Sequence, residues 1–223
     1  MEIEKVKAQS LSDGTKYFGE GYFKDGDFIP HGFGKKKLPN CYAMGTFTHG
    51  ILNGPAIISH GYQMNTVIMN NNRVNGWGMC VNSGTIIKFG YYKNSKCQED
   101  LSHLVDWFWN DVLANSGRTH ENMLHCYRNP KEILIGYPGN GKKGFLEPRF
   151  MGFSFMEDGS VYIGWSHTRK KTGDFLKFTP EGYIKCGHFI DGEIVEEFDL
   201  KLLAEFYNSH TKYKIDINKC YKK

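Results

Sequence analysis

The chain has 223 residues, of which 40% are hydrophobic and 15% aromatic, enough for a sizeable core in one large domain or two small ones. Its formal net charge of +4 is mild and lacks the dense basic stripe of nucleic-acid-binding proteins, so we expect no nucleic-acid partner. The first residues form no apolar segment of signal-peptide length, and no later stretch is apolar enough to span a bilayer. Six scattered cysteines form no C-x-x-C pair, which is typical of reduced thiols. We therefore expect a cytoplasmic protein, and leave open a peripheral association with a membrane.

A pattern with a period of about 23 residues organises two parts of the chain, residues 1–98 and 131–194. Its closing position is glycine in all but one of seven units: Gly21, Gly45, Val67, Gly90, Gly141, Gly164 and Gly187. Four units carry an aromatic residue two positions later, namely Phe23, Phe47, Tyr92 and Phe189. Three have a further glycine where a tight bend needs positive φ, namely Gly26, Gly50 and Gly192. Each unit is therefore predicted to be strand, turn and strand, and to bury its apolar face by stacking on its neighbours.

The stretches YFGEGYFKDGDFIPHGFG and GSVYIGWSHTRKKTGDF resemble degenerate MORN repeats (membrane occupation and recognition nexus), with the pattern Y-x-G-x-[WF]-x-x-G-x-x-x-G-x-G. The resemblance covers residues 13–95 and 152–194 well and 136–151 poorly. Val67 and Asn72 depart from it by replacing glycines. The resemblance implies a mainly β fold of stacked antiparallel hairpins that form an open ribbon, and a role as an interaction scaffold.

Two helices are expected outside the repeats. In the segment 99–130, apolar residues recur at helical spacing over 99–115, and Ser95 with Gln98 matches a capping box. Trp107 and Trp109 flank that apolar face, either to wedge the helix against the repeats or to anchor a partner. In the segment 195–223, a helix over 199–208 is predicted to cap the end of the stack.

The stretch EILIGYPGNGKK at 132–143 matches most of the phosphate-loop pattern G-x-x-x-x-G-K-[ST]. Lys143 stands where a Ser or Thr would ligate Mg²⁺, and no helical pattern follows. Gly141 also falls on the repeat's glycine position, 23 residues before Gly164. We therefore interpret the stretch as a turn in an eroded repeat, and expect neither a nucleotide nor another cofactor.

No group of residues predicts catalysis. His120, His125 and Cys126 form the only local histidine cluster, and their spacing matches no zinc motif. Adjacent Cys and His residues do not indicate a nucleophile, because such pairs normally meet through the fold. No paired carboxylates stand out either. We expect no catalytic residue and no metal site.

Basic clusters occur at Lys35 to Lys37, at Lys142 with Lys143, and at Arg169 to Lys171. They either keep exposed strand edges apart from other molecules or form a rim that binds anions. The candidate binding residues are Trp107, Trp109, Arg169, Lys35, Lys36, Lys37, Lys170 and Lys171.

Three functions remain open from the sequence. The first is a non-enzymatic scaffold for a protein partner or a second copy of the chain. The second is a peripheral module for anionic phospholipid headgroups, which the mild charge supports weakly. The third is an enzyme or effector activity within 99–130, where no site is visible.

Overall fold

A computed structural model describes most of the chain, and the described part is mainly β. It covers residues 2–82, 85–102, 104–105, 125–129, 131–138, 150–166, 171–199, 201–202 and 205. The chain divides into two compact units. The first consists of Met1–Asp100, Arg128–Ile133 and Phe155–Gly159, and the second of Leu101–Tyr127, Leu134–Ser154 and Ser160–Lys223.

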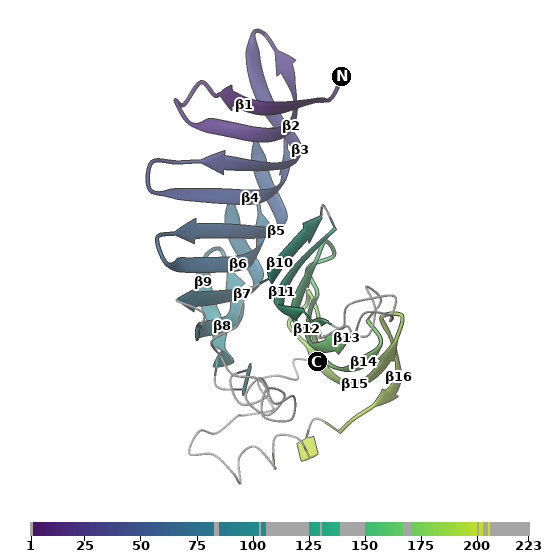
Figure 1. The fold of residues 1–223 in the computed structure, drawn as a ribbon. Coiled ribbons are helices and arrows are strands. Elements are labelled where there is room, and N and C mark those ends of the chain that lie inside the picture. The colour runs from purple at the N-terminus through teal and green to yellow at the C-terminus, as the bar shows by residue number, and fades with distance from the viewer. Residues whose placement is uncertain are drawn as a thin grey trace. The chain divides into compact units, whose positions relative to one another are not determined.

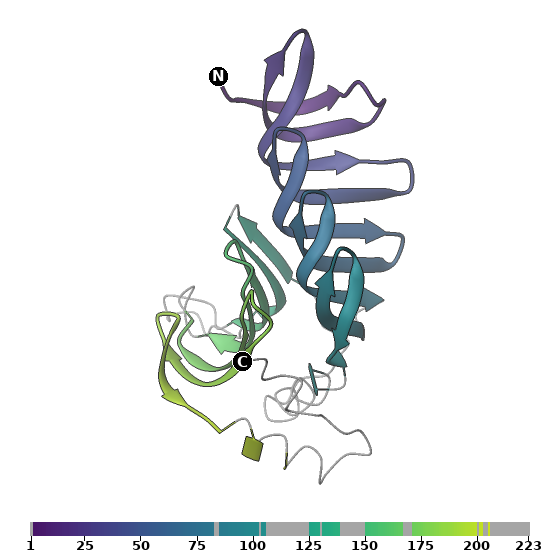
Figure 2. The same ribbon diagram turned by 180° about the vertical axis from the view of Figure 1, so that it is seen from behind.

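The first sheet has nine strands, which lie side by side in chain order and are all antiparallel (Figure 1). They are β1 (Glu4–Ser10), β2 (Lys16–Lys24), β3 (Asp27–Lys37), β4 (Cys41–Thr48), β5 (Ile51–His60), β6 (Gln63–Asn70), β7 (Arg73–Asn82), β8 (Thr85–Lys93) and β9 (Lys96–Asp100). Figure 2 shows from behind how their hairpins follow one another along the sheet. Every strand therefore pairs only with its neighbours in sequence, and the sheet is not closed.

The second sheet repeats this arrangement with seven strands, again in chain order. They are β10 (His125–Asn129), β11 (Glu132–Pro138), β12 (Phe150–Met156), β13 (Val161–Ser166), β14 (Gly173–Phe178), β15 (Ile184–Ile190) and β16 (Glu193–Glu197). The pairs from β13 to β16 are antiparallel. The predicted open arrangement of antiparallel hairpins is thus confirmed for the described strands.

The hairpin turns confirm the predicted bends. Gly26, Gly50 and Gly192 have φ of 88°, 82° and 90°, and the residue before each also has positive φ. In the third unit Asn71 and Asn72 occupy the same two positions with φ of 50° and 59°. Asparagine tolerates this conformation better than other residues with a side chain, so Asn72 can replace the glycine of the repeat pattern.

Each of four turns is hydrogen-bonded to the preceding hairpin. The N–H of the second turn residue donates to a carbonyl about 20 residues earlier: Gly50 to Pro30 at 2.7 Å, Asn72 to Leu52 at 3.2 Å, Ser95 to Val74 at 2.8 Å, and Gly192 to Lys171 at 2.9 Å. In three turns the first residue also donates its N–H to a side chain next to that carbonyl: His49 to His31 Nδ1 at 3.4 Å, Asn71 to Asn53 Oδ1 at 2.9 Å, and Asp191 to Thr172 Oγ1 at 3.2 Å. One docking geometry therefore recurs in both sheets.

The glycines that close the repeat units make room for the next strand. An added Cβ at Gly21 would lie 2.5 Å from the Phe28 ring, and one at Gly187 would lie 2.8 Å from Ile194. Gly34 likewise makes room for the Tyr17 ring, because an added Cβ at Gly34 would overlap the phenol. Close contact between hairpins thus depends on these positions having no side chain.

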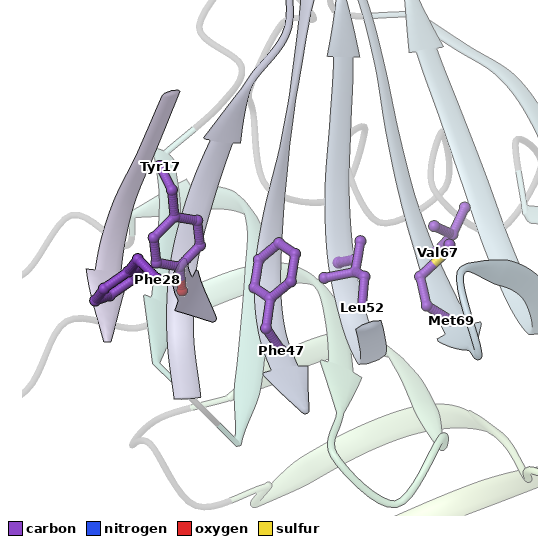
Figure 3. Close-up of a cluster of buried hydrophobic side chains, with 7 residues drawn as sticks. Tyr17, Phe28, Phe47, Leu52, Val67 and Met69 are labelled. Atoms are coloured by element: carbon purple, nitrogen blue, oxygen red, sulfur yellow. The ribbon is translucent and has the colours of Figure 1, made fainter. Parts of the chain in front are cut away.

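A row of buried side chains runs across β2 to β6 on one face of the first sheet (Figure 3). The cluster comprises Tyr17, Phe28, Phe47, Leu52, Ala56, Val67 and Met69. Tyr17 packs edge-on against Phe47, with ring centroids 5.4 Å apart, and its hydroxyl donates to the Glu20 carbonyl at 2.9 Å. Because the cluster takes residues from successive hairpins, it joins the repeat units into one core.

The predicted helices lie mostly outside the described residues. Residues 102, 104 and 105 are helical, and the Val105 N–H donates to the Leu101 carbonyl at 3.1 Å. Residues 201, 202 and 205 are helical in the other predicted segment. The predicted cap at Ser95 and Gln98 is wrong, because Ser95 occupies the β8–β9 turn with φ of 63° and Gln98 lies in β9.

Candidate binding surface

The three consecutive lysines of β3 are divided between the two faces of the strand, because successive side chains of a strand point to opposite sides. Lys36 is held in an ion pair, with its Nζ 2.6 Å from Oδ2 of Asp13. The hydrogen bond from Lys36, with further bonds from Thr15, lowers the pKa of Asp13 to about 2. Lys36 was a predicted binding residue, but in this structure its charge is already partnered.

Lys35 and Lys37 line a hollow of about 530 Å³ at the β3–β4 end of the first sheet. Its wall consists of Phe18, Lys35, Lys37, Leu38, Pro39, Asn40, Cys41, Tyr42, Ser59 and Gly61. The ammonium group of Lys35 lies 3.9 Å from the centroid of the Tyr42 ring, a cation–π contact that orients the side chain. The hollow therefore combines two cations with an aromatic and apolar wall.

Strand register assembles this hollow. Lys37 is opposite Lys16 on β2 and Tyr42 on β4, and Lys35 is opposite Phe18. Side chains of opposed residues lie on the same face of a sheet, so cations and rings from three strands meet there. The short 38–40 connection closes that end, and the Leu38 N–H donates to the Cys41 carbonyl at 2.9 Å.

The charge in the hollow is not neutralised within the described part of the chain. Neither Lys35 nor Lys37 has a carboxylate within ion-pair distance among the described residues, and no acidic residue lines the wall. The absence of an ion-pair partner costs such lysines little free energy, because water can solvate their ammonium groups. The arrangement suits an anionic group attached to an apolar body, since the ammonium groups and the rings can be used together.

Of the remaining predicted binding residues, only Lys171 is described by the structure, and it belongs to the second unit. Lys171 is buried, with 8% of its surface exposed, and its carbonyl accepts the turn hydrogen bond from Gly192. Its Nζ lies 5.9 Å from the Tyr162 ring. Lys171 is therefore not an exposed cation in this structure, while its role in binding stays a prediction. The other predicted residues, Trp107, Trp109, Arg169 and Lys170, lie outside the described residues.

A polar aromatic cluster on the first sheet was missed from the sequence. The Tyr22 hydroxyl lies 2.7 Å from Nδ1 of His49, and the rings of His31 and His49 have centroids 4.9 Å apart. These residues come from β2, β3 and the β4–β5 turn, so only the register brings them together. The cluster supports the docking of that turn. In the described part of the chain, no group of three or more His, Cys, Asp or Glu could hold a metal ion.

The phosphate-loop pattern begins inside a strand. Gly136 belongs to β11, and an added Cβ on Gly152 would lie 2.7 Å from its Cα, so its backbone packs against the next strand. A phosphate loop needs its backbone N–H groups free to face a ligand. The later positions, including Gly141, Lys142 and Lys143, lie outside the described residues. His125 and Cys126 begin β10, and His120 is also outside.

None of the helices within the described ranges has the length and hydrophobicity needed to cross a membrane. Compared with models of known protein families, the chain matches none of them, and comparison with curated proteins gives no significant match either.

Proposed function

We propose that this chain is a non-enzymatic interaction scaffold built from MORN-like hairpin repeats, and that the hollow lined by Lys35 and Lys37 is its binding surface for an acidic segment of a protein. The observation that carries the proposal is the combination of two lysines without carboxylate partners and an exposed aromatic wall on an otherwise well-packed sheet.

The repeat architecture supports a scaffold role for a physical reason. The docked turns and the buried row from Tyr17 to Met69 hold neighbouring hairpins in a fixed register, so side chains on the exposed face keep constant spacings. A preorganised surface loses less conformational entropy on binding than a flexible one. The hollow is lined by residues of four strands of such a sheet, β2 to β5, and these residues are therefore positioned before a partner arrives.

A polyglutamate peptide is a suitable first probe, with binding measured by calorimetry at low and high salt. We expect binding that is at least tenfold weaker in a Lys35→Ser/Lys37→Ser variant, because the two charges that face the ligand are gone. The matched control is Lys24→Ser/Lys93→Ser, which removes two exposed lysines at hairpin ends and should bind like the unchanged chain. Equal binding by both variants would show that the hollow is not the site.

The second candidate function is a peripheral module for anionic phospholipid headgroups, which the same two uncompensated lysines favour. Vesicles containing phosphatidylserine, tested in a sedimentation assay beside neutral vesicles, separate the two candidates. If the hollow binds protein, the chain should bind the acidic peptide and stay in the supernatant when the vesicles are sedimented. Steeply salt-dependent binding to the anionic vesicles, with no binding of the peptide, would instead support the lipid function.

A further inference from the structure

The last strand of the second sheet carries an acidic and apolar segment. Residues 193–199 read EIVEEFD, with four carboxylates in seven residues. Val195 and Phe198 within it are 57% and 38% exposed, and Ile190 on the neighbouring strand β15 is 50% exposed. The acidic residues Glu193, Glu196, Glu197 and Asp199 are exposed as well. The segment therefore presents negative charge and apolar surface together.

This segment lies at a sheet edge. Strand β16 is the terminal strand in the order of the second sheet, so only one of its sides pairs with another described strand. Its pairing with β15 shifts between His188 and Phe189, and Val195 is the extra residue in the resulting bulge. Exposed edges usually carry lysines, bulges or other devices against uncontrolled pairing. Here the edge is acidic, which makes it selective for a basic surface.

The acidic segment and the hollow on β2 to β5 are complementary in charge. Lys35 and Lys37 are two residues apart on one strand, and Lys16 lies opposite Lys37, so three ammonium groups are available on that face. Glu197 and Asp199 are likewise two residues apart, and every second residue of an extended segment is about 6.6–7 Å apart. The exposed Phe18, at 36%, offers apolar surface to Val195 or Phe198.

We infer that the hollow of one copy of this chain binds the acidic segment 193–199 of a second copy. The inference rests on the proposed function and names its partner. The carboxylates and Lys37 are exposed and Lys35 is partly exposed, and none of these residues has an ion-pair partner among the described residues. Because the two surfaces differ, one contact leaves a free hollow and a free acidic segment. The pair then either closes with a second, identical contact or extends by adding copies.

Charge reversal with mixing tests this inference, with molar mass measured by light scattering during size-exclusion chromatography. The unchanged chain should self-associate at about 0.05 M salt and dissociate at about 0.5 M. Lys35→Glu/Lys37→Glu and Glu196→Lys/Glu197→Lys should each be monomeric, because like charges then face each other. Mixing the two variants should restore a complex, since the second variant keeps a basic hollow and the first keeps an acidic segment. The control Lys24→Glu/Lys93→Glu should associate like the unchanged chain.

The outcomes separate this inference from the function on which it rests. The second copy would be overturned as the partner if the unchanged chain were monomeric at about 100 μM and low salt, or if the mixture stayed monomeric. In both samples a basic hollow and an acidic segment are present together, so the inference requires them to bind. If the polyglutamate peptide still bound the hollow in that case, the scaffold function would stand with another acidic partner. Restoration in the mixture also shows that both variants are folded, since misfolded chains would not form a defined complex.

Discussion

Substitution of Asn72 tests whether hairpin docking holds the first sheet together. Asn72 has φ of 59° at the β6–β7 turn, its N–H donates to the Leu52 carbonyl at 3.2 Å, and its Oδ1 accepts from the Leu52 N–H at 2.8 Å. Asn72→Gly removes only the side-chain hydrogen bond and suits the backbone. Asn72→Ala removes the same bond and also places a Cβ in the left-handed region.

The two variants should therefore differ by a predictable amount. Loss of the bond to Leu52 should cost about 1 kcal/mol, because the turn is exposed and water can replace part of it. The left-handed conformation adds about 1–2 kcal/mol for alanine and nothing for glycine. We expect about 1 kcal/mol for Asn72→Gly and about 2–3 kcal/mol for Asn72→Ala. For a chain of this size the latter corresponds to a fall in melting temperature of roughly 5–10 °C.

Urea unfolding followed by far-ultraviolet circular dichroism measures these changes in the free energy of unfolding. Gly50→Ala provides a matched control, because its φ is 82°, an added Cβ meets nothing within 4 Å, and no side-chain bond is lost. It should cost about 1–2 kcal/mol. Equal effects of the two Asn72 variants would refute the conformational argument. An unchanged stability in both would show that the docking bond to Leu52 contributes nothing.

Three further predictions concern the first sheet. Gly34→Ala should lower the free energy of unfolding by more than about 2 kcal/mol, since the new methyl group would displace the buried Tyr17 ring. Gly26→Ala, whose added Cβ meets no atom within 4 Å, should cost only the conformational term of about 1–2 kcal/mol; equal effects of the two variants in denaturant melts would contradict this. Tyr17→Phe should cost about 1 kcal/mol through loss of the hydroxyl's bond to a main-chain carbonyl, and a stability equal to that of the unchanged chain would count against the bond. Asp13→Asn should cost under about 1 kcal/mol at pH 7, because the ion pair with Lys36 is half exposed. The pKa of Asp13 is lowered from 3.8 to about 2, so its contribution is present above pH 3.8 and should disappear as the pH falls through 2; a difference that persists at pH 1.5 would exclude the ion pair as its cause.

The repeat period and the bends could be predicted because they depend on local chemistry. Glycine at positions 26, 50 and 192 is favoured by the positive φ that a tight hairpin needs at that point. A pattern that counts only glycines misses Asn72, because asparagine also adopts positive φ and adds a side-chain hydrogen bond to Leu52. The predicted cap at Ser95 failed for a related reason. Its Oγ lies 3.2 Å from the Val74 N–H, so the oxygen that could cap a helix accepts a bond in hairpin docking instead.

The candidate binding surface could be predicted only in part, because it depends on strand register. The lysine cluster at 35–37 could be seen in the sequence. That Lys36 pairs with Asp13 while Lys35 and Lys37 line the hollow depends on the alternation of side chains along β3 and on the position of Asp13. Tyr42 was not a candidate, since nothing in its local sequence places it opposite Lys37. The burial of Lys171 was also not predictable from a run of basic residues that usually indicates an exposed loop.

Hairpin docking makes the length of the first sheet adjustable by whole units. The docked turns at Gly50, Asn72 and Ser95 follow one another by 22 and 23 residues, and each uses only the hairpin before it. Duplication of one such segment in a gene would therefore supply both the donor and the acceptor of a new docking bond. A duplication of half that length would place a strand where a turn has to dock. Growth or loss of whole hairpins by unequal recombination is thus compatible with this architecture, and the sheet needs no matching change elsewhere to remain paired.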